Sequence, residues 1–152
     1  MKRWMETAFD EAFYGVNNGE GGPFGAVIIK DGILISQAHN KVLTSNDPTA
    51  HAEINAIRFA SQKLNTFDLS GCTLFTTCMP CPMCLGAIMW SRISQVYYTA
   101  TAEDAKNAGF DDEHFYEKLI KKDKGIHLKH LDSKRSLELF DLWNKKEDRR
   151  IY

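Results

Sequence analysis

Two short motifs in this 152-residue chain combine residue types that bind metals and move protons. The first is His51-Ala52-Glu53, and the second is Pro80-Cys81-Pro82-Met83-Cys84. Two thiolates three residues apart can hold one zinc ion, above all at a helix N-terminus, where backbone N–H groups stabilise negative sulfur. With His51 as the third ligand, the fourth position is left to water or hydroxide, as in catalytic zinc sites. We therefore predict one zinc ion per chain, bound by His51, Cys81 and Cys84.

Glu53 is the predicted catalytic residue of such a site. Zinc lowers the pKa of a bound water toward about 7, and a nearby carboxylate can pass a proton from that water to a leaving nitrogen. Positions i and i+2 lie roughly 200° apart on an ideal helix, so His51 and Glu53 reach one metal only if it lies off the helix end. The order His-x-Glu, then Pro-Cys-x-x-Cys, is the signature of zinc deaminases that act on nucleobases.

The two remaining cysteines leave alternatives open. Cys78 precedes Cys81 and Cys84 at the spacing of iron–sulfur ligands, and Cys72 would supply a fourth. A closed zinc site with four protein ligands is a further alternative, and it would make the chain a metal-stabilised binding or scaffold module. Neither alternative explains the His-x-Glu motif. Cys72 and Cys78 flank a short β-rich segment, where they are more simply interpreted as small buried hydrophobic residues.

The apolar pattern predicts the elements that must position these motifs. Helical spacing of apolar residues predicts a helix over 3–17. Asp47-Pro48 and Pro82 are favourable helix starts, the second helix ending near Trp90. Strands are predicted over 24–29, 33–36, 73–77 and 93–98, with Asp31-Gly32 as the turn of a hairpin. This alternation of helices and strands indicates a layered α/β domain.

The C-terminal third is expected to add smaller elements to the same domain. Helices are predicted over 102–108, 113–121 and 133–149, and an edge strand over 126–128. No repeat, low-complexity tract or linker divides the chain, so residues 1–152 are predicted to form one domain. Hydrophobic residues make up 43% and charged residues 26% of the chain, and these values are ordinary for a globular protein.

Charge and hydropathy exclude several kinds of partner. The formal net charge of −1 gives no general attraction to nucleic acid or to a membrane surface. The N-terminus lacks the apolar stretch of a signal peptide, and no apolar run reaches the about 18 residues of a membrane span. A cytoplasmic location, without membrane or nucleic-acid partners, is therefore expected.

Four segments carry a resemblance that covers nearly the whole chain. They are GGPFGAV at 21–27, NDPTAHAE at 46–53, PCPMCLGAI at 80–88 and AGFDD at 108–112. The sequence resembles the cytidine-deaminase-like superfamily and, within it, most closely the small bacterial guanine deaminases. The Gly-Phe-Asp-Asp stretch favours this group over the tRNA adenosine deaminases, which share the metal motifs.

The resemblance implies a three-layer fold, with a five-stranded mixed sheet between helices. The implied reaction is the hydrolytic deamination of guanine to xanthine and ammonia, in which the purine stacks beside the metal site. Asn40 would hydrogen-bond the base, Phe24 would form an aromatic wall, and Asp112 would hold the guanine edge. Backbone N–H groups near Ala52 and Cys81 would stabilise the tetrahedral intermediate.

The resemblance also implies a homodimer, with C-terminal segments exchanged in some members so that a terminal aromatic closes the neighbour's pocket. Tyr152 is the matching aromatic residue here. One departure is clear: Met79 stands where the group has glutamate before Pro-Cys, and zinc binding should survive this change. The closest alternative is a deaminase of another nucleobase or nucleoside, or of adenosine in tRNA. The near-neutral charge argues against RNA, because phosphate contacts need clustered Lys and Arg.

Overall fold

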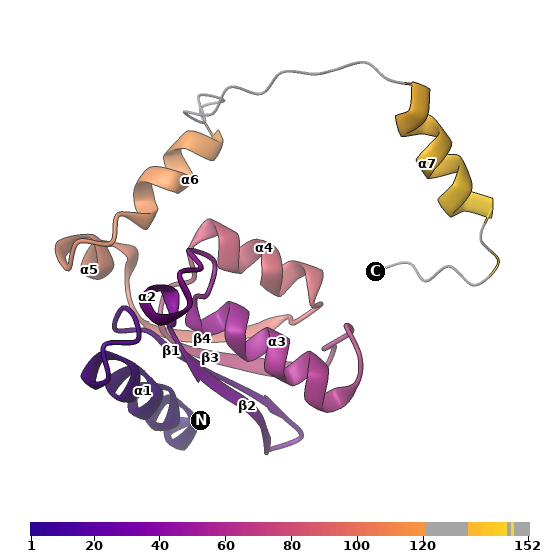
Figure 1. The fold of residues 1–152 in the computed structure, drawn as a ribbon. Helices are drawn as coiled ribbons and strands as arrows, with labels where there is room; N and C mark the ends of the chain where they lie inside the picture. The colour runs from indigo at the N-terminus through magenta and orange to yellow at the C-terminus, as the bar shows by residue number, and fades with distance from the viewer. Residues whose placement is uncertain (121–133, 146, 148–152) are drawn as a thin grey trace.

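A computed structural model describes residues 1–120, 134–145 and 147 of the chain, and Figure 1 shows its elements. The helices are α1 Lys2–Asn17, α2 Val42–Ser45, α3 Ala52–Leu64, α4 Pro82–Trp90, α5 Ala102–Asn107, α6 Asp112–Ile120 and α7 Lys134–Lys145. The strands are β1 Gly25–Lys30, β2 Ile33–His39, β3 Cys72–Cys78 and β4 Gln95–Ala100. No helix within these described ranges is both long and apolar enough to cross a lipid bilayer.

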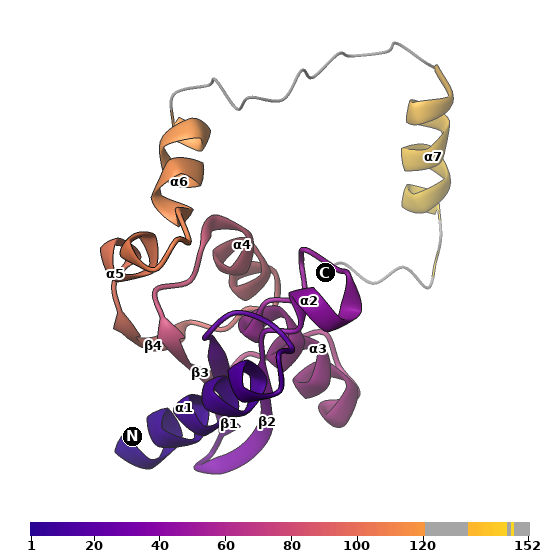
Figure 2. The same ribbon diagram turned by 60° about the vertical axis from the view of Figure 1, so that its left-hand side comes forward.

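The first hundred residues form three layers, with the sheet between α1 on one face and α3 and α4 on the other (Figures 1 and 2). Alternate strand residues build the two interfaces, as the two-residue period of a strand requires. Val27 and Phe75 pack with Ala8 of α1. Ile28 and Leu74 face the opposite way and pack with the alanines of α3. The predicted layered α/β class is confirmed.

The sheet is mixed, in the strand order β2-β1-β3-β4. β1 pairs antiparallel with both β2 and β3, whereas β3 and β4 pair in parallel across α4. The predicted hairpin turn is present, with φ values of +50° at Asp31 and +74° at Gly32, which are the left-handed angles of a type I′ turn. The Pro-Cys-x-x-Cys motif follows the end of β3, where the crossover helix α4 begins.

The prediction of five strands is confirmed for four of them. Within the described residues the sheet has four strands, and the fifth predicted strand, 126–128, lies outside those residues. The strand predicted over 93–98 runs instead from Gln95 to Ala100, and the hairpin strand that began at Ile33 extends to His39. The last predicted helix, 133–149, is described over 134–145.

The predicted helix start at Asp47-Pro48 is wrong, because Asp47 caps a turn. Its Oδ1 accepts hydrogen bonds from the Thr49 backbone N–H at 2.8 Å and the Thr49 hydroxyl at 2.7 Å. Short polar side chains compete with the helix for the backbone in this way. The helix begins at Ala52 instead, and the short helix α2 precedes it in the chain.

Candidate active site

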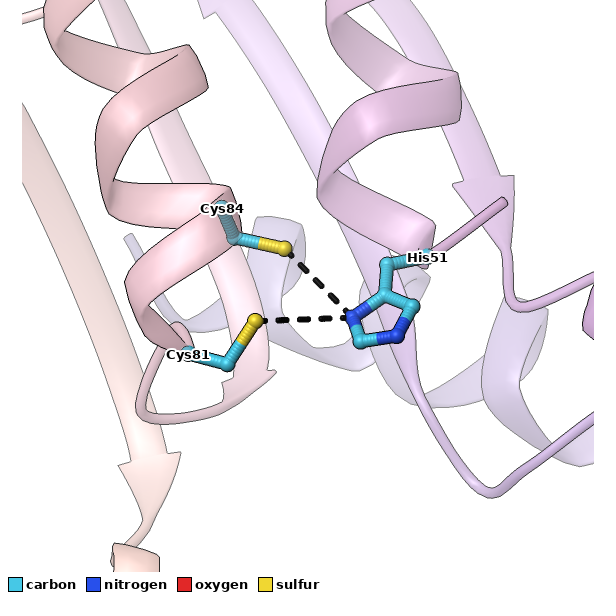
Figure 3. A group of neighbouring side chains, drawn as sticks. All are labelled: His51, Cys81 and Cys84. Atoms are coloured by element: carbon cyan, nitrogen blue, oxygen red, sulfur yellow. Dashed lines mark hydrogen bonds between the residues drawn. The ribbon is translucent and has the colours of Figure 1, made fainter. Parts of the chain in front are cut away.

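The three predicted metal ligands meet where two helices begin (Figure 3). His51 is the N-cap residue of α3 and Cys81 is the N-cap residue of α4, both with extended backbone angles, and Cys84 lies in the first turn of α4. Because His51 precedes the first helical turn, its backbone angles are not helical, and the roughly 200° separation of positions i and i+2 on a helix does not apply to His51 and Glu53. The first backbone N–H groups of α3 and of α4 have no partner within their helices, so they favour negative charge in the space between the two helix starts.

The separations of the ligand atoms match a zinc site. His51 Nδ1 lies 3.7 Å from Cys81 Sγ and 3.6 Å from Cys84 Sγ. Tetrahedral zinc with Zn–S bonds of about 2.3 Å and Zn–N bonds of about 2.1 Å places sulfur and nitrogen about 3.6 Å apart. The three ligand atoms all lie within 4.8 Å of one another, and no other such trio is found in the described part of the chain. The residues present therefore fit zinc.

The two thiols differ in their electrostatic surroundings. Hydrogen bonds from Cys84 and His51 lower the pKa of the Cys81 thiol to about 4, against the opposing effect of burial. The same contact with Cys81, together with burial, raises the pKa of the Cys84 thiol. The His51 ring has a raised pKa because it donates to the Cys81 sulfur. The lowered pKa of Cys81 favours its thiolate form, which is the form that binds zinc.

Glu53 lies against this group and is only 5% exposed. Its Oε1 accepts a hydrogen bond from the Thr76 hydroxyl at 3.0 Å, and its Oε2 lies 3.5 Å from Cys84 Sγ. Burial raises the pKa of the Glu53 carboxyl, and the Thr76 hydrogen bond opposes the shift. A carboxyl group whose pKa is raised, beside a metal site, is suited to taking and returning protons near neutral pH.

A cavity of about 600 Å³ opens onto this group and is mainly apolar in its lining. Six of the predicted site residues line it: Phe24, Asn40, His51, Glu53, Cys81 and Asp112. Its other lining residues include Gly21, Gly22, Val42, Leu43, Pro48, Cys78, Met79 and Phe110. The cavity therefore connects the glycine-rich segment (Gly21 and Gly22), the residues around α2 and the predicted metal ligands in one site. Its volume is large enough for a small ring ligand.

The polar and aromatic walls of the cavity are held by specific contacts. Asn40 Oδ1 accepts hydrogen bonds from the backbone N–H groups of Gly22 at 3.3 Å and Val42 at 3.1 Å. Its amide nitrogen is consequently the end left to donate. Phe24 meets Phe110 edge to face, with ring centroids 4.9 Å apart. Phe110 was not singled out from the sequence, and only its place in the AGFDD segment marks it.

Asp112 reaches the cavity from the first turn of α6. Burial and the negative charge on Cys81 raise the pKa of its carboxyl. One turn further along the same helix, the Tyr116 hydroxyl donates a hydrogen bond of 2.7 Å to the Pro80 carbonyl, directly before the ligand Cys81. This hydrogen bond ties the helix that carries Asp112 to the metal-binding loop.

Two predicted substrate contacts are not placed in the cavity. The Ala52 side chain is fully buried in the core, and only its backbone N–H, at the first helical position, remains for the predicted role. Tyr152 lies outside the described residues. Cys78 and Met79 line the cavity although neither was predicted as a contact.

The chain is similar in sequence and structure to known zinc-binding deaminases. Residues 1–100 match the cytidine and deoxycytidylate deaminase zinc-binding region. A guanine deaminase of Bacillus subtilis is 47% identical over 150 residues, covering 95% of this chain and 96% of that protein. A tRNA-specific adenosine deaminase of Aquifex aeolicus is 45% identical over 106 residues, covering 70% of this chain and 68% of that protein.

The chain is also similar to solved structures of guanine deaminases. The X-ray structure of guanine deaminase from Bacillus subtilis superposes with a TM-score of 0.94 at 44% identity, and covers 99% of this chain and 98% of that one. A structure of a guanine deaminase from Nitrosomonas europaea gives a TM-score of 0.68 at 34% identity, and covers 72% of this chain and 63% of that one.

Proposed function

The chain belongs to the zinc-binding cytidine and deoxycytidylate deaminase family, and from this membership we propose that it catalyses the hydrolytic deamination of guanine to xanthine and ammonia. One observation carries the proposal: His51 and Cys81 of the three-ligand group line one cavity together with the buried Glu53 and Asp112. The similarity to a guanine deaminase over 95% of the chain extends past the metal motifs into the C-terminal third, where Asp112 lies.

Glu53 moves the protons of this reaction. Zinc held by His51, Cys81 and Cys84 would lower the pKa of a water molecule toward neutral pH. Water adds to carbon 2 of guanine, and the Glu53 carboxylate takes a proton from it and delivers that proton to the adjacent ring nitrogen. The proton of the hydroxyl group added at carbon 2 then passes through Glu53 to the amino group, the bond between carbon 2 and the amino nitrogen breaks, and ammonia leaves to yield xanthine.

The cavity walls orient the base for this attack. With its Oδ1 occupied by two backbone N–H groups, Asn40 offers its amide N–H to a purine acceptor. Asp112 accepts from the N–H edge of guanine, and the rings of Phe24 and Phe110 flank the base. The N–H of Ala52, at the start of α3, helps to stabilise the tetrahedral adduct.

Purified, zinc-loaded protein should convert guanine to xanthine, with the conversion read by ultraviolet absorbance and by ammonia release. Guanosine, adenine and cytosine should react far more slowly in the same panel. Folded, zinc-loaded protein that leaves guanine unchanged would contradict the proposal. Activity confined to a tRNA anticodon stem would favour the tRNA adenosine deaminases, one of which is similar over 70% of this chain, compared with 95% for the guanine deaminase.

Asp112→Asn should lower kcat/KM for guanine by about tenfold to a hundredfold, because a hydrogen bond to a charged group contributes roughly 1.5–3 kcal/mol. Steady-state kinetics with guanine measure the effect. Asp111→Asn is the matched control: Asp111 is exposed, and its Oδ1 caps the His114 backbone N–H at 3.2 Å. Equal losses in the two variants would contradict a substrate contact at Asp112.

Tyr116→Phe should lower kcat/KM for guanine about threefold to tenfold, since a lost hydrogen bond contributes roughly 0.5–1.5 kcal/mol. The variant removes only the hydroxyl that binds the Pro80 carbonyl, so α6 should hold Asp112 less firmly. Tyr98→Phe, at a half-exposed position of β4, removes a hydroxyl away from the cavity and should leave kcat/KM unchanged. Unchanged kinetics in Tyr116→Phe would show that α6 does not depend on this contact.

We also propose that the enzyme is a cytoplasmic homodimer. Exposed apolar side chains on α3 and α4, namely Phe59, Met89 and Trp90, support an interface between copies. Four free cysteines suit a reducing compartment. Light scattering of the purified protein tests the dimer. The proposed exchange of C-terminal segments, with Tyr152 closing the neighbour's pocket, concerns residues outside the described ones.

A further inference from the structure

A histidine with no part in the proposed chemistry is buried between two carboxylates next to the cavity. His39, the last residue of β2, is 5% exposed. Its Nδ1 lies 2.7 Å from Glu11 Oε2 on α1, and its Nε2 lies 3.0 Å from Glu20 Oε2. Glu20 Oε2 also lies 3.0 Å from Lys41 Nζ. We call Glu11, His39 and Glu20 the histidine clamp.

The histidine clamp joins two carboxyl groups through the two nitrogens of one imidazole ring. A neutral imidazole has one N–H and could donate to only one of the two carboxylates, whereas the protonated ring donates to both. Glu11, His39, Glu20 and Lys41 then alternate in charge, so the buried ring is balanced on both sides. Charge-assisted hydrogen bonds of this kind are about twice as strong as neutral ones.

The clamp ends on the segment that forms one wall of the cavity. Glu20 immediately precedes Gly21 and Gly22, and its backbone carbonyl accepts from the Leu43 and Thr44 N–H groups at 3.2 Å each. A Cβ atom on Gly21 would stand 2.2 Å from Asn40 Oδ1 and 2.4 Å from Asn40 O. The segment therefore lies directly against Asn40, so a displacement of Glu20 is expected to disturb Asn40, which lines the cavity.

The clamp contacts only the binding side of the site. Its side chains come from α1, the end of β2 and the segment after α1, while His51, Glu53, Cys81 and Cys84 stand on α3 and α4. The backbone of His39 is held separately, because Asn55 Nδ2 donates to the His39 carbonyl at 3.1 Å. Changing the His39 side chain should thus loosen the Asn40 wall without detaching β2 from α3 or disturbing the metal group.

We propose that His39, acting through Glu11 and Glu20, is a positioning residue for purine binding, and this inference rests on the proposed deamination of guanine. The clamp ties α1 to the glycine-rich segment and keeps Asn40 and its neighbours at the distance the base requires. The clamp therefore stabilises the bound substrate and the transition state to the same extent. Loss of the clamp consequently raises KM and leaves kcat nearly unchanged.

Two variants break the clamp from opposite ends. His39→Gln leaves an amide that reaches one carboxylate but cannot span both. Glu20→Ala removes the side-chain contact between His39 and the segment that continues into Gly21 and Gly22, and keeps the Glu11 contact. Each should raise KM for guanine about tenfold, with kcat within about twofold of wild type. The affinity for the product xanthine, measured by calorimetry, should fall by the same factor. The double variant should be no worse than either single one, because both break one connection.

Three control variants separate positioning from general destabilisation. Ser36→Ala, also on β2, loses a buried hydrogen bond of 2.8 Å to the Ala56 carbonyl, and should lower stability without raising KM. Glu20→Gln keeps an oxygen that accepts from His39 Nε2 and should restore most of the affinity. Lys41→Ala isolates the part of the Glu20→Ala effect that comes from the lost ion pair, and should raise KM much less.

The outcomes distinguish the inference from the function on which it rests. Unchanged KM and xanthine affinity in folded His39→Gln and Glu20→Ala would overturn the inference. An equal rise of KM in Ser36→Ala would also overturn it, because the effect would then follow stability alone. Wild-type protein that forms no xanthine from guanine would overturn the proposed function instead.

Discussion

Glu53→Gln is expected to lower kcat for guanine by about a thousandfold while the protein still binds one zinc ion per chain, since positioned general acid–base groups contribute about 10²–10⁴ in rate. Glutamine keeps the size of the side chain and an oxygen that can accept from Thr76, now 3.0 Å from Glu53 Oε1. It cannot exchange a proton with water and substrate. Binding of xanthine should change little, because Glu53 acts on the reacting atoms.

The measurement pairs single-turnover kinetics with metal analysis of the same preparation. None of the ligands His51, Cys81 and Cys84 is altered, so zinc content should match wild type. Glutamine also removes the unfavourable burial of a carboxylate, the cause that raises the pKa of Glu53, so the variant should fold at least as well. Turnover close to wild type in zinc-loaded Glu53→Gln would contradict the proton-transfer role.

The ligand group could be predicted from the sequence because its pieces are local. Cys81 and Cys84 are one helical turn apart, and Pro82 marks the helix start that places them. The spacing of His51 and Glu53 also required the metal to lie off the N-terminal end of their helix. His51 is the N-cap residue of that helix, α3. The helix start itself was misplaced, because Asp47 had an equally good local use as a turn cap.

Contacts between distant segments could not be predicted in the same way. The histidine clamp joins Glu11, Glu20 and His39, and no local periodicity or motif connects a helix face with the end of a strand. The pairing of Phe24 with Phe110 depends likewise on where α5 and α6 return to the sheet. Such contacts arise only from the packed fold, and they shape the cavity walls rather than the metal group.

Cys81→Ser and Cys84→Ser are expected to lose zinc and to turn over guanine at least about 10³-fold more slowly, because the metal that activates water is no longer held. Serine is close to cysteine in size, but its hydroxyl is a poor zinc ligand beside the thiolate it replaces. Zinc content by atomic absorption and initial rates with guanine measure both effects. Turnover that survives in metal-free protein would contradict the zinc mechanism.

Cys78→Ala and Cys72→Ala are the matched controls, and they decide between an open and a closed metal site. Burial raises the pKa of the Cys78 thiol to about 11, and its sulfur lies 3.7 Å from the Thr101 carbonyl, so a neutral thiol is expected there. Cys72 is buried in the main core, away from the ligand trio. Both variants should therefore keep one zinc ion per chain. Loss of zinc in Cys78→Ala would mean a fourth protein ligand, which leaves no position for water and favours the scaffold module over the enzyme.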